Sequence, residues 1–138
     1  MTTTLDRSTD PGSGSAVDDQ ARADLLASVN AFAAQHLAPG ALARAHDPSY
    51  SWDIAARLGE QGLLGLTIDV ADGGQGAGLA TAVAVIQAVA RHCPKSADIL
   101  QAGNFGAIRT FAQFGAPEQK AAYLPGLLAG TSLISLGM

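Results

Sequence analysis

Few residues in this chain have the types and spacing of a catalytic or ligand-binding set. The glycine-rich segment 72–78 could cradle a phosphate, but it lacks the Lys and Ser/Thr that follow in a P-loop and has no strand before it. A turn between helices is the favoured interpretation. His36, His46 and His92 have no mutual spacing that indicates a metal site, so each is interpreted as a helix-end or surface residue.

Two further side chains have chemical potential. Cys93 stands at a predicted helix end without an activating partner near it in sequence, which favours a packing role over nucleophilic catalysis. Asp98 lies one helical turn before Ala102 and close to Gly103 and Gly106. It is either a solvated carboxylate that the helix dipole favours or a polar group at the floor of a substrate pocket. The residues alone show no acid–base pair, catalytic triad or cofactor fingerprint.

Composition restricts the class of protein. The 138 residues are enough for about one domain, and 48% apolar against 14% charged residues excludes disorder of the whole chain. The net charge of −4, with eight scattered basic residues, gives no footprint for nucleic acid or anionic membrane. One cysteine cannot form an internal disulfide, and no apolar run has the length of a signal peptide or a membrane span. We therefore expect a soluble, cytoplasmic protein without a metal site.

The hydrophobic pattern predicts an all-α fold of about five to six helices in an orthogonal or up-down bundle. Residues 1–16 are too polar to order and are expected to form a disordered tail. Helices are expected over 18–36, 51–62, 79–92, 95–114 and 117–128, the fourth interrupted at Gly103 and Gly106.

The last predicted helix and the residues after it complete this interpretation. Its inner face is expected to consist of Tyr123, Leu124, Leu127 and Leu128. The apolar residues 131–138 that follow are typical of a short terminal β-strand.

Several segments resemble the N-terminal helical domain of the acyl-CoA dehydrogenase family. The segment 58–68 resembles a helix-to-strand passage that precedes a Gly-Gly loop, and Gly103 and Asn104 match a Gly-Asn pair. The most specific match is a Phe-Gly, Glu-Gln-Lys, Tyr-Leu-Pro, Gly pattern. Its residues here are Phe114, Gly115, Glu118, Gln119, Lys120, Tyr123, Leu124, Pro125 and Gly130. The matches occur in order and cover residues 17–138.

The chain departs from the family pattern at the Gly-Gly loop. The family usually has a proline before this loop and an aromatic residue just ahead of it, where this chain has Asp69 and Asp72. We therefore expect the loop to pack differently here.

The resemblance implies a three-part flavoenzyme. Residues 17–130 correspond to its N-terminal helical domain, and residues 131–138 to the start of a middle β domain that the chain does not complete. FAD binds mainly to the middle and C-terminal parts. A C-terminal glutamate, not present here, removes the α-proton of an acyl thioester while the β-hydride passes to the flavin. The implied partners are acyl-CoA, a homo-oligomer (tetramer or dimer) and an electron-transfer flavoprotein.

The resemblance also implies site residues. Asp98, Ile99, Ala102 and Gly103 correspond to residues that line the acyl pocket, and Leu136, Gly137 and Met138 to residues that abut the flavin. An ionised Asp98 would be costly beside an alkyl tail, so we expect a polar or bulky acyl group.

Two alternatives remain open at this point. The chain could be the first domain of a related flavin oxidase or monooxygenase. The reactivity of the full-length reduced enzyme with oxygen would distinguish this alternative. It could also be a stand-alone helical binding module, which would have to bury the apolar side chains of its last residues.

Overall fold

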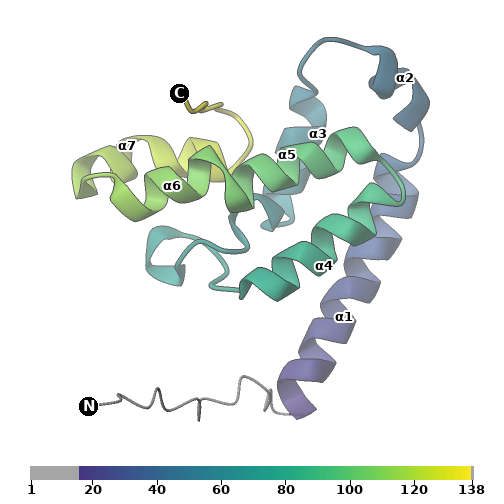
Figure 1. Cartoon of the computed structure of the whole chain (residues 1–138), viewed down its shortest axis with the longest axis horizontal. Coiled ribbons are helices and arrows are strands. Elements are labelled where there is room, and N and C mark those ends of the chain that lie inside the picture. The colour runs from purple at the N-terminus through teal and green to yellow at the C-terminus, as the bar shows by residue number, and fades with distance from the viewer. Residues whose placement is uncertain (1–15, 138) are drawn as a thin grey trace, which may run out of the picture.

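The protein is described by a computed structural model of residues 16–137, and these residues form an all-α fold (Figure 1). Six helices have eight or more residues: α1 (Ala16–Phe32), α3 (Trp52–Glu60), α4 (Leu79–Ala90), α5 (Pro94–Phe105), α6 (Ala107–Phe114) and α7 (Pro117–Leu128). A shorter helix, α2 (Ala41–His46), a π-helical turn, Ala33–Leu37, and two 3₁₀ turns, Leu63–Gly65 and Val70–Asp72, complete the regular structure. The all-α prediction is confirmed.

The helices form two connected groups. Helices α4 and α5 lie side by side, α1 packs on α4, and α3 contacts the 3₁₀ turn Leu63–Gly65 (Figure 1). Helices α6 and α7 form a second pair that contacts this group through the end of α5. No helix among the described residues combines the length and the apolar character that crossing a membrane requires.

The interior consists of two hydrophobic clusters. The main core contains buried side chains from α1, α3, α4, α5 and the segments between them, among them Leu37, Leu58 and Leu100. A smaller cluster, here called the α6–α7 core, consists of Ile68, Ile108, Ala112, Leu124 and Leu127. The protein therefore has a large and a small interior, joined where α5 meets α6.

The interruption expected at Gly106 in the helix predicted over 95–114 is present, whereas Gly103 lies within α5. The chain leaves helical geometry at Gly106, between α5 and α6. A Cβ atom at Gly106 would lie 2.6 Å from the carbonyl oxygen of Ala102, so a larger residue would force the backbone to shift at this break. The first predicted helix is also divided, since α1 ends at Phe32 and a π turn follows it.

Two further expectations need correction. The predicted terminal strand is absent from the described residues, because 133–137 have no regular structure and no neighbouring strand to bond with. Tyr123 was expected on the inner face of α7, but it is 64% exposed, and its ring meets the Phe111 ring edge-on at 6.4 Å. Residues 1–15 of the predicted tail lie outside the described residues, and Ala16 is the first residue of α1.

Candidate functional site

A small apolar cavity lies where the two cores meet, and we call it the seam cavity. It has a volume of about 30 Å³, and its lining residues are Tyr50, Leu64, Ile99, Ala102, Gly103, Ile108, Leu127, Gly130, Ser132, Leu133 and Ile134. Three of the four residues expected to contact an acyl group, Ile99, Ala102 and Gly103, are therefore brought together. Asp98 is exposed on α5 and does not line this cavity.

Close approach of α5 to the 3₁₀ turn Leu63–Gly65 shapes one wall of the seam cavity. Gly103 is buried, and a Cβ atom at this position would lie 2.9 Å from the carbonyl oxygen of Leu64. Because real Cβ atoms do not come this close to backbone, only glycine fits without displacement of the turn.

Asn104 holds the same turn against α5. Its side chain is fully buried, and its Nδ2 donates to the carbonyl oxygens of Leu63 at 2.8 Å and Leu100 at 3.0 Å. Its Oδ1 accepts from the Thr67 backbone N–H at 3.1 Å, and the Thr67 hydroxyl donates to the Asn104 carbonyl at 2.7 Å. The Gly-Asn pair therefore fixes the geometry of the cavity wall, with Asn104 satisfying buried polar groups of both elements.

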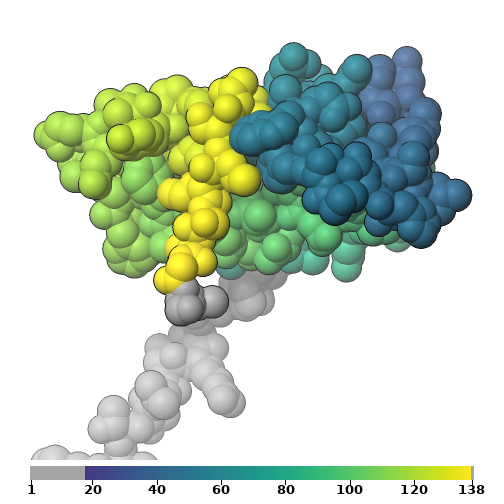
Figure 2. Space-filling model, turned by 90° about the horizontal axis from the view of Figure 1, so that it is seen from above, coloured from purple at the N-terminus to yellow at the C-terminus, as the bar shows by residue number. Residues whose placement is uncertain are grey.

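The terminal segment, residues 131–137, covers another side of the seam cavity. Figure 2 shows it in yellow across one face, between the α6–α7 pair and the blue region that contains α2 and α3. Leu133 and Ile134 line the cavity, whereas Leu136 and Gly137 are exposed and do not line it. Met138 lies outside the described residues.

The described residues do not by themselves form a flavin site. Nothing lies within 4 Å of the Cβ position of Gly137, and Leu136 is 53% exposed, so neither residue belongs to a formed cradle. The glycine-rich loop does not supply a phosphate site either. Its backbone N–H groups at Gly74, Gln75 and Gly76 donate to carbonyl oxygens of Asp69, Gly65 and Ile68. The interpretation of this segment as a turn is therefore confirmed.

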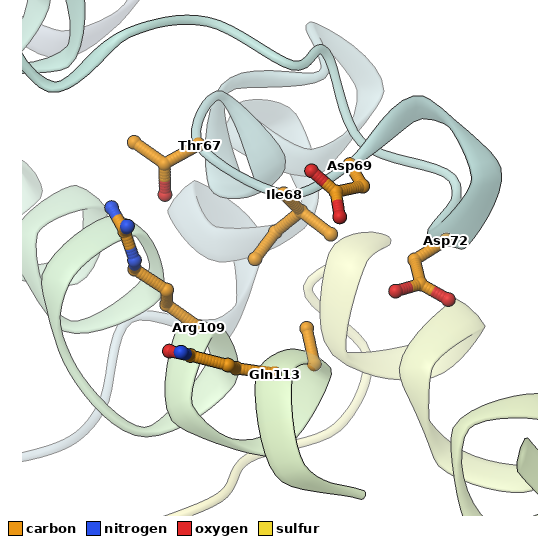
Figure 3. Close-up of a pocket in the computed structure, with 7 residues that line it drawn as sticks. Thr67, Ile68, Asp69, Asp72, Arg109 and Gln113 are labelled. Carbon is orange, nitrogen blue, oxygen red and sulfur yellow. The ribbon is translucent and has the colours of Figure 1, made fainter.

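A second cavity, of about 250 Å³, has a polar lining, and we call it the polar cavity (Figure 3). Thr67, Asp69 and Asp72 approach it from the loop, and Arg109 and Gln113 from α6. Asp72 also forms an ion pair with Lys120 on α7, in which Asp72 Oδ2 lies 2.8 Å from Lys120 Nζ. The two aspartates that depart from the family pattern thus lie at this cavity, and one of them ties the loop to α7.

The Glu-Gln-Lys motif has local roles at the start of α7. The Gln119 side-chain oxygen accepts from the Ala116 backbone N–H at 2.9 Å, which satisfies a donor that precedes the helix. Glu118 lies in the first turn, where the helix dipole favours a negative charge. With Lys120 paired to Asp72, the motif fixes both the start of α7 and its position on the loop.

Cys93 is fully buried at the start of α5, which supports the packing role. Its Sγ accepts from the Ser96 hydroxyl at 3.0 Å and from Arg44 Nη2 at 3.6 Å. Burial raises the pKa of the thiol, but the Ser96 hydrogen bonds and the Arg44 guanidinium outweigh burial and hold the pKa below its usual value. Sequence spacing could not show the Arg44 contact, because Arg44 is 49 residues away, whereas Ser96 lies only three residues from Cys93.

The histidines are separated in the structure. His36 packs on the Phe32 ring at 5.2 Å, His92 shares a 2.8 Å hydrogen bond with Asn30, and His46 is exposed at the end of α2. Among the described residues, no three His, Cys, Asp or Glu side chains are grouped so that they could hold a metal ion.

Comparison with protein families finds a match over the segments that contain the glycine-rich loop, the Gly-Asn pair and the Glu-Gln-Lys motif. The family described as acyl-CoA dehydrogenase, N-terminal domain, matches residues 19–131, which contain the seam cavity wall, the glycine loop and α7. The chain belongs to the acyl-CoA dehydrogenase family.

Curated relatives in this family give the same assignment. A 3-sulfinopropanoyl-CoA desulfinase of Variovorax paradoxus is 33% identical over 80% of this chain and 28% of its own length. The mitochondrial short/branched chain specific acyl-CoA dehydrogenase of Bos taurus is 33% identical over 75% of this chain and 24% of its own. An acyl-CoA dehydrogenase of Bacillus subtilis is 27% identical over 76% of this chain. The chain thus spans about a quarter of the length of these relatives.

Sequence reasoning missed several residues of the seam cavity. Tyr50 comes from the segment between α2 and α3, and Leu133 and Ile134 come from the predicted strand. The exposed apolar residues after α7 were a signal that this segment covers something, but the sequence alone could not identify the surface beneath it.

Proposed function

We propose that this chain is the N-terminal domain of an FAD-dependent acyl-CoA dehydrogenase and that the seam cavity receives the end of the acyl group. The observation that carries the proposal is the gathering of Ile99, Ala102 and Gly103 at one apolar cavity within the part of the chain that the family model matches. The activity proposed for the complete enzyme is α,β-dehydrogenation of an acyl thioester, and this chain alone is not catalytic.

The residues of this chain contribute shape to the reaction. Ile99 and Ala102 give the acyl end an apolar wall, and Gly103 lets α5 lie close to the Leu64 backbone so that the cavity stays narrow. Confining the end of the acyl group restricts where its reacting carbons can lie, which lowers the entropic cost of reaching the transition state. Asp98 lies outside the cavity, so its carboxylate gives no reason to expect the polar or bulky acyl group that the sequence suggested.

The cofactor and partners follow from the family proposal. FAD would accept the hydride, and it would be held mainly by residues other than those described, with Leu136, Gly137 and Met138 as the residues of this chain that approach it. A homo-oligomer and an electron-transfer flavoprotein are the proposed assembly and electron acceptor.

The direct test is anaerobic mixing of the complete flavoprotein with a series of acyl-CoA thioesters. Loss of the visible absorbance of oxidised flavin, together with formation of the enoyl thioester, is the expected result. Flavin that stays oxidised with every thioester, while the protein is folded and loaded with FAD, would contradict dehydrogenation.

A second function is suggested by the relatives. The Variovorax paradoxus and Paraburkholderia xenovorans proteins, 33% and 32% identical to this chain, are both named 3-sulfinopropanoyl-CoA desulfinase. Such an activity in this protein would break the carbon–sulfur bond of that thioester with water as co-reactant: the carbon gains a proton, the sulfinate sulfur gains the water oxygen and leaves as sulfite, and the flavin is not consumed as an oxidant. Measuring sulfite release and flavin absorbance in one sample separates the two functions.

A further inference from the structure

Tyr50 presents the one polar side chain at the seam cavity that is partly withdrawn from water. Its residue is partly buried, whereas Ser132, which has the other hydroxyl in the lining, is exposed. Within residues 16–137, the Tyr50 hydroxyl makes no hydrogen bond to the protein. Burial raises the pKa of this phenol above its usual value, so the hydroxyl stays protonated and able to donate at neutral pH.

The position of Tyr50 is fixed by its neighbours. Lys95 Nζ on α5 donates to the backbone carbonyl oxygens of Ser49, at 3.0 Å, and Asp47, so the segment before Tyr50 is tied to the helix that lines the cavity. The Tyr50 ring meets the Trp52 ring edge-on with centroids 4.8 Å apart. A side chain held from both sides can act in recognition without a large entropic cost of ordering.

The lining of the cavity limits what can bind beside this hydroxyl. None of its eleven residues has a charged side chain. An anionic acyl end would therefore lose water without gaining a cation, which is costly. The cavity is small, about 30 Å³, so it accepts only the end of an acyl group.

We propose that Tyr50 is a specificity-determining residue that favours short acyl thioesters ending in a neutral hydrogen-bonding atom, such as a terminal hydroxyl. This inference rests on the proposed function, because it assigns the acyl end to the seam cavity. The Tyr50 hydroxyl exchanges a hydrogen bond with the terminal atom of the acyl group. A terminal methyl cannot form this hydrogen bond. A terminal carboxylate would lose its water at this uncharged cavity without gaining a cation.

The test uses the complete flavoprotein with 4-hydroxybutanoyl-CoA, butanoyl-CoA and succinyl-CoA. For the unaltered protein we expect the hydroxyl-ended thioester to have the highest kcat/KM, about ten-fold above the methyl-ended one, as one hydrogen bond provides. Tyr50→Phe keeps the ring and removes the hydroxyl. It should lower kcat/KM for 4-hydroxybutanoyl-CoA about ten-fold and leave butanoyl-CoA within about two-fold.

A matched control and a binding measurement make the outcome decisive. Tyr123 is the other tyrosine of the chain and is 64% exposed on α7, so Tyr123→Phe should leave both substrates unchanged. Calorimetric Kd values for unreactive thioether analogues with hydroxyl and methyl ends should show the same selective loss in Tyr50→Phe. If Tyr50→Phe weakened binding of the hydroxyl-ended and methyl-ended analogues equally, or of neither, the inference would be overturned while the proposed function stands. Failure of the unaltered protein to bind these three thioesters while longer ones bind would also overturn the inference, and only failure with the whole series of acyl thioesters would overturn the proposed function itself.

Discussion

The main core and the α6–α7 core differ in how completely they are buried. The main core encloses large side chains such as Leu37, Leu58 and Leu100 with no exposure to solvent, and Asn104 beside it is satisfied by three segments of backbone. The α6–α7 core consists of five buried residues. The difference indicates that the larger region provides stability and positions the smaller one.

Large apolar side chains are exposed on both regions. Leu42 and Leu79 on the larger region are 76% and 49% exposed, and Phe114 on the smaller region is 76% exposed. Leu133 and Leu136, close together in the terminal segment, are 58% and 53% exposed, and exposed large apolar groups that lie near one another often mark surfaces of interaction. Under the proposed function, the terminal segment marks the side on which the rest of the enzyme would pack, with the seam cavity at its inner edge.

The largest effect is expected within the larger region, from removing the side chain that holds the Leu63–Gly65 turn against α5. Asn104→Ala would leave the Leu63 carbonyl and the Thr67 N–H buried without partners, which should cost about 3 kcal/mol of unfolding free energy. Asn30→Ala removes an amide that is exposed and bonds only His92, so its cost should stay below about 0.5 kcal/mol. Urea unfolding measures the free-energy cost of each variant. Equal costs would show that Asn104 does not hold the turn against α5.

A smaller effect is expected at the close contact of α5 with the turn. Gly103→Ala puts a methyl group 2.9 Å from the Leu64 carbonyl oxygen and should cost about 2 kcal/mol. Gly78→Ala is the matched change, because nothing lies within 4 Å of its Cβ position and its φ is −68°. Its unfolding free energy should change by less than about 0.5 kcal/mol. If Gly103→Ala proved as mild, the cavity wall would be more adaptable than described.

The ion pair between the loop and α7 should matter less. Asp72 and Lys120 are 25% and 24% exposed, so water screens the pair, and Lys120→Met should cost about 0.5 kcal/mol. The difference from the unaltered protein should shrink as salt is added, because salt screens partly exposed charges. A cost that does not depend on salt would mean that packing of the Lys120 stem, not charge, stabilises α7.

The smallest effect concerns the phenol at the seam. Burial places the folded pKa of Tyr50 above its unfolded value near 10, so protonated Tyr50 is favoured in the fold. Stability is thus unaffected below pH 10 and falls as pH rises through that value, because the unfolded chain releases its proton first. A spectrophotometric titration of the two tyrosines should show one step above pH 10 that disappears in Tyr50→Phe. Its persistence would assign the shifted phenol to Tyr123 instead.

Local patterns predicted the helices, because capping residues, glycine breaks and apolar spacing are properties of short segments. Helices α3, α4 and α7 lie where the sequence indicates. Ile99, Ala102 and Gly103 line one cavity, and their contact with an acyl group stays a prediction. Helix α2 was missed because none of its residues is buried, so it has no apolar stripe to detect.

Contacts between distant segments were beyond such reasoning. Tyr50 reaches the seam cavity across about fifty residues of chain from Ile99, and Asp72 pairs with Lys120 across 48 residues of chain. The family resemblance assigned Asp98 to the pocket, but Asp98 is exposed on α5 and lies outside the seam cavity. The domain boundaries and the flavin contacts of Leu136, Gly137 and Met138 stay predictions.

The most direct test of the account is the acyl-length profile of Ala102→Leu in the complete flavoprotein. Ala102 lines the seam cavity, and the larger side chain fills a volume of only about 30 Å³. We expect kcat/KM for the longer thioesters to fall at least about ten-fold while the shortest is retained, since an occupied cavity excludes the distal acyl carbons. Ala80→Leu, on the exposed first turn of α4, is the control. An Ala102→Leu profile identical to that of Ala80→Leu would contradict the assignment of the seam cavity to the acyl group.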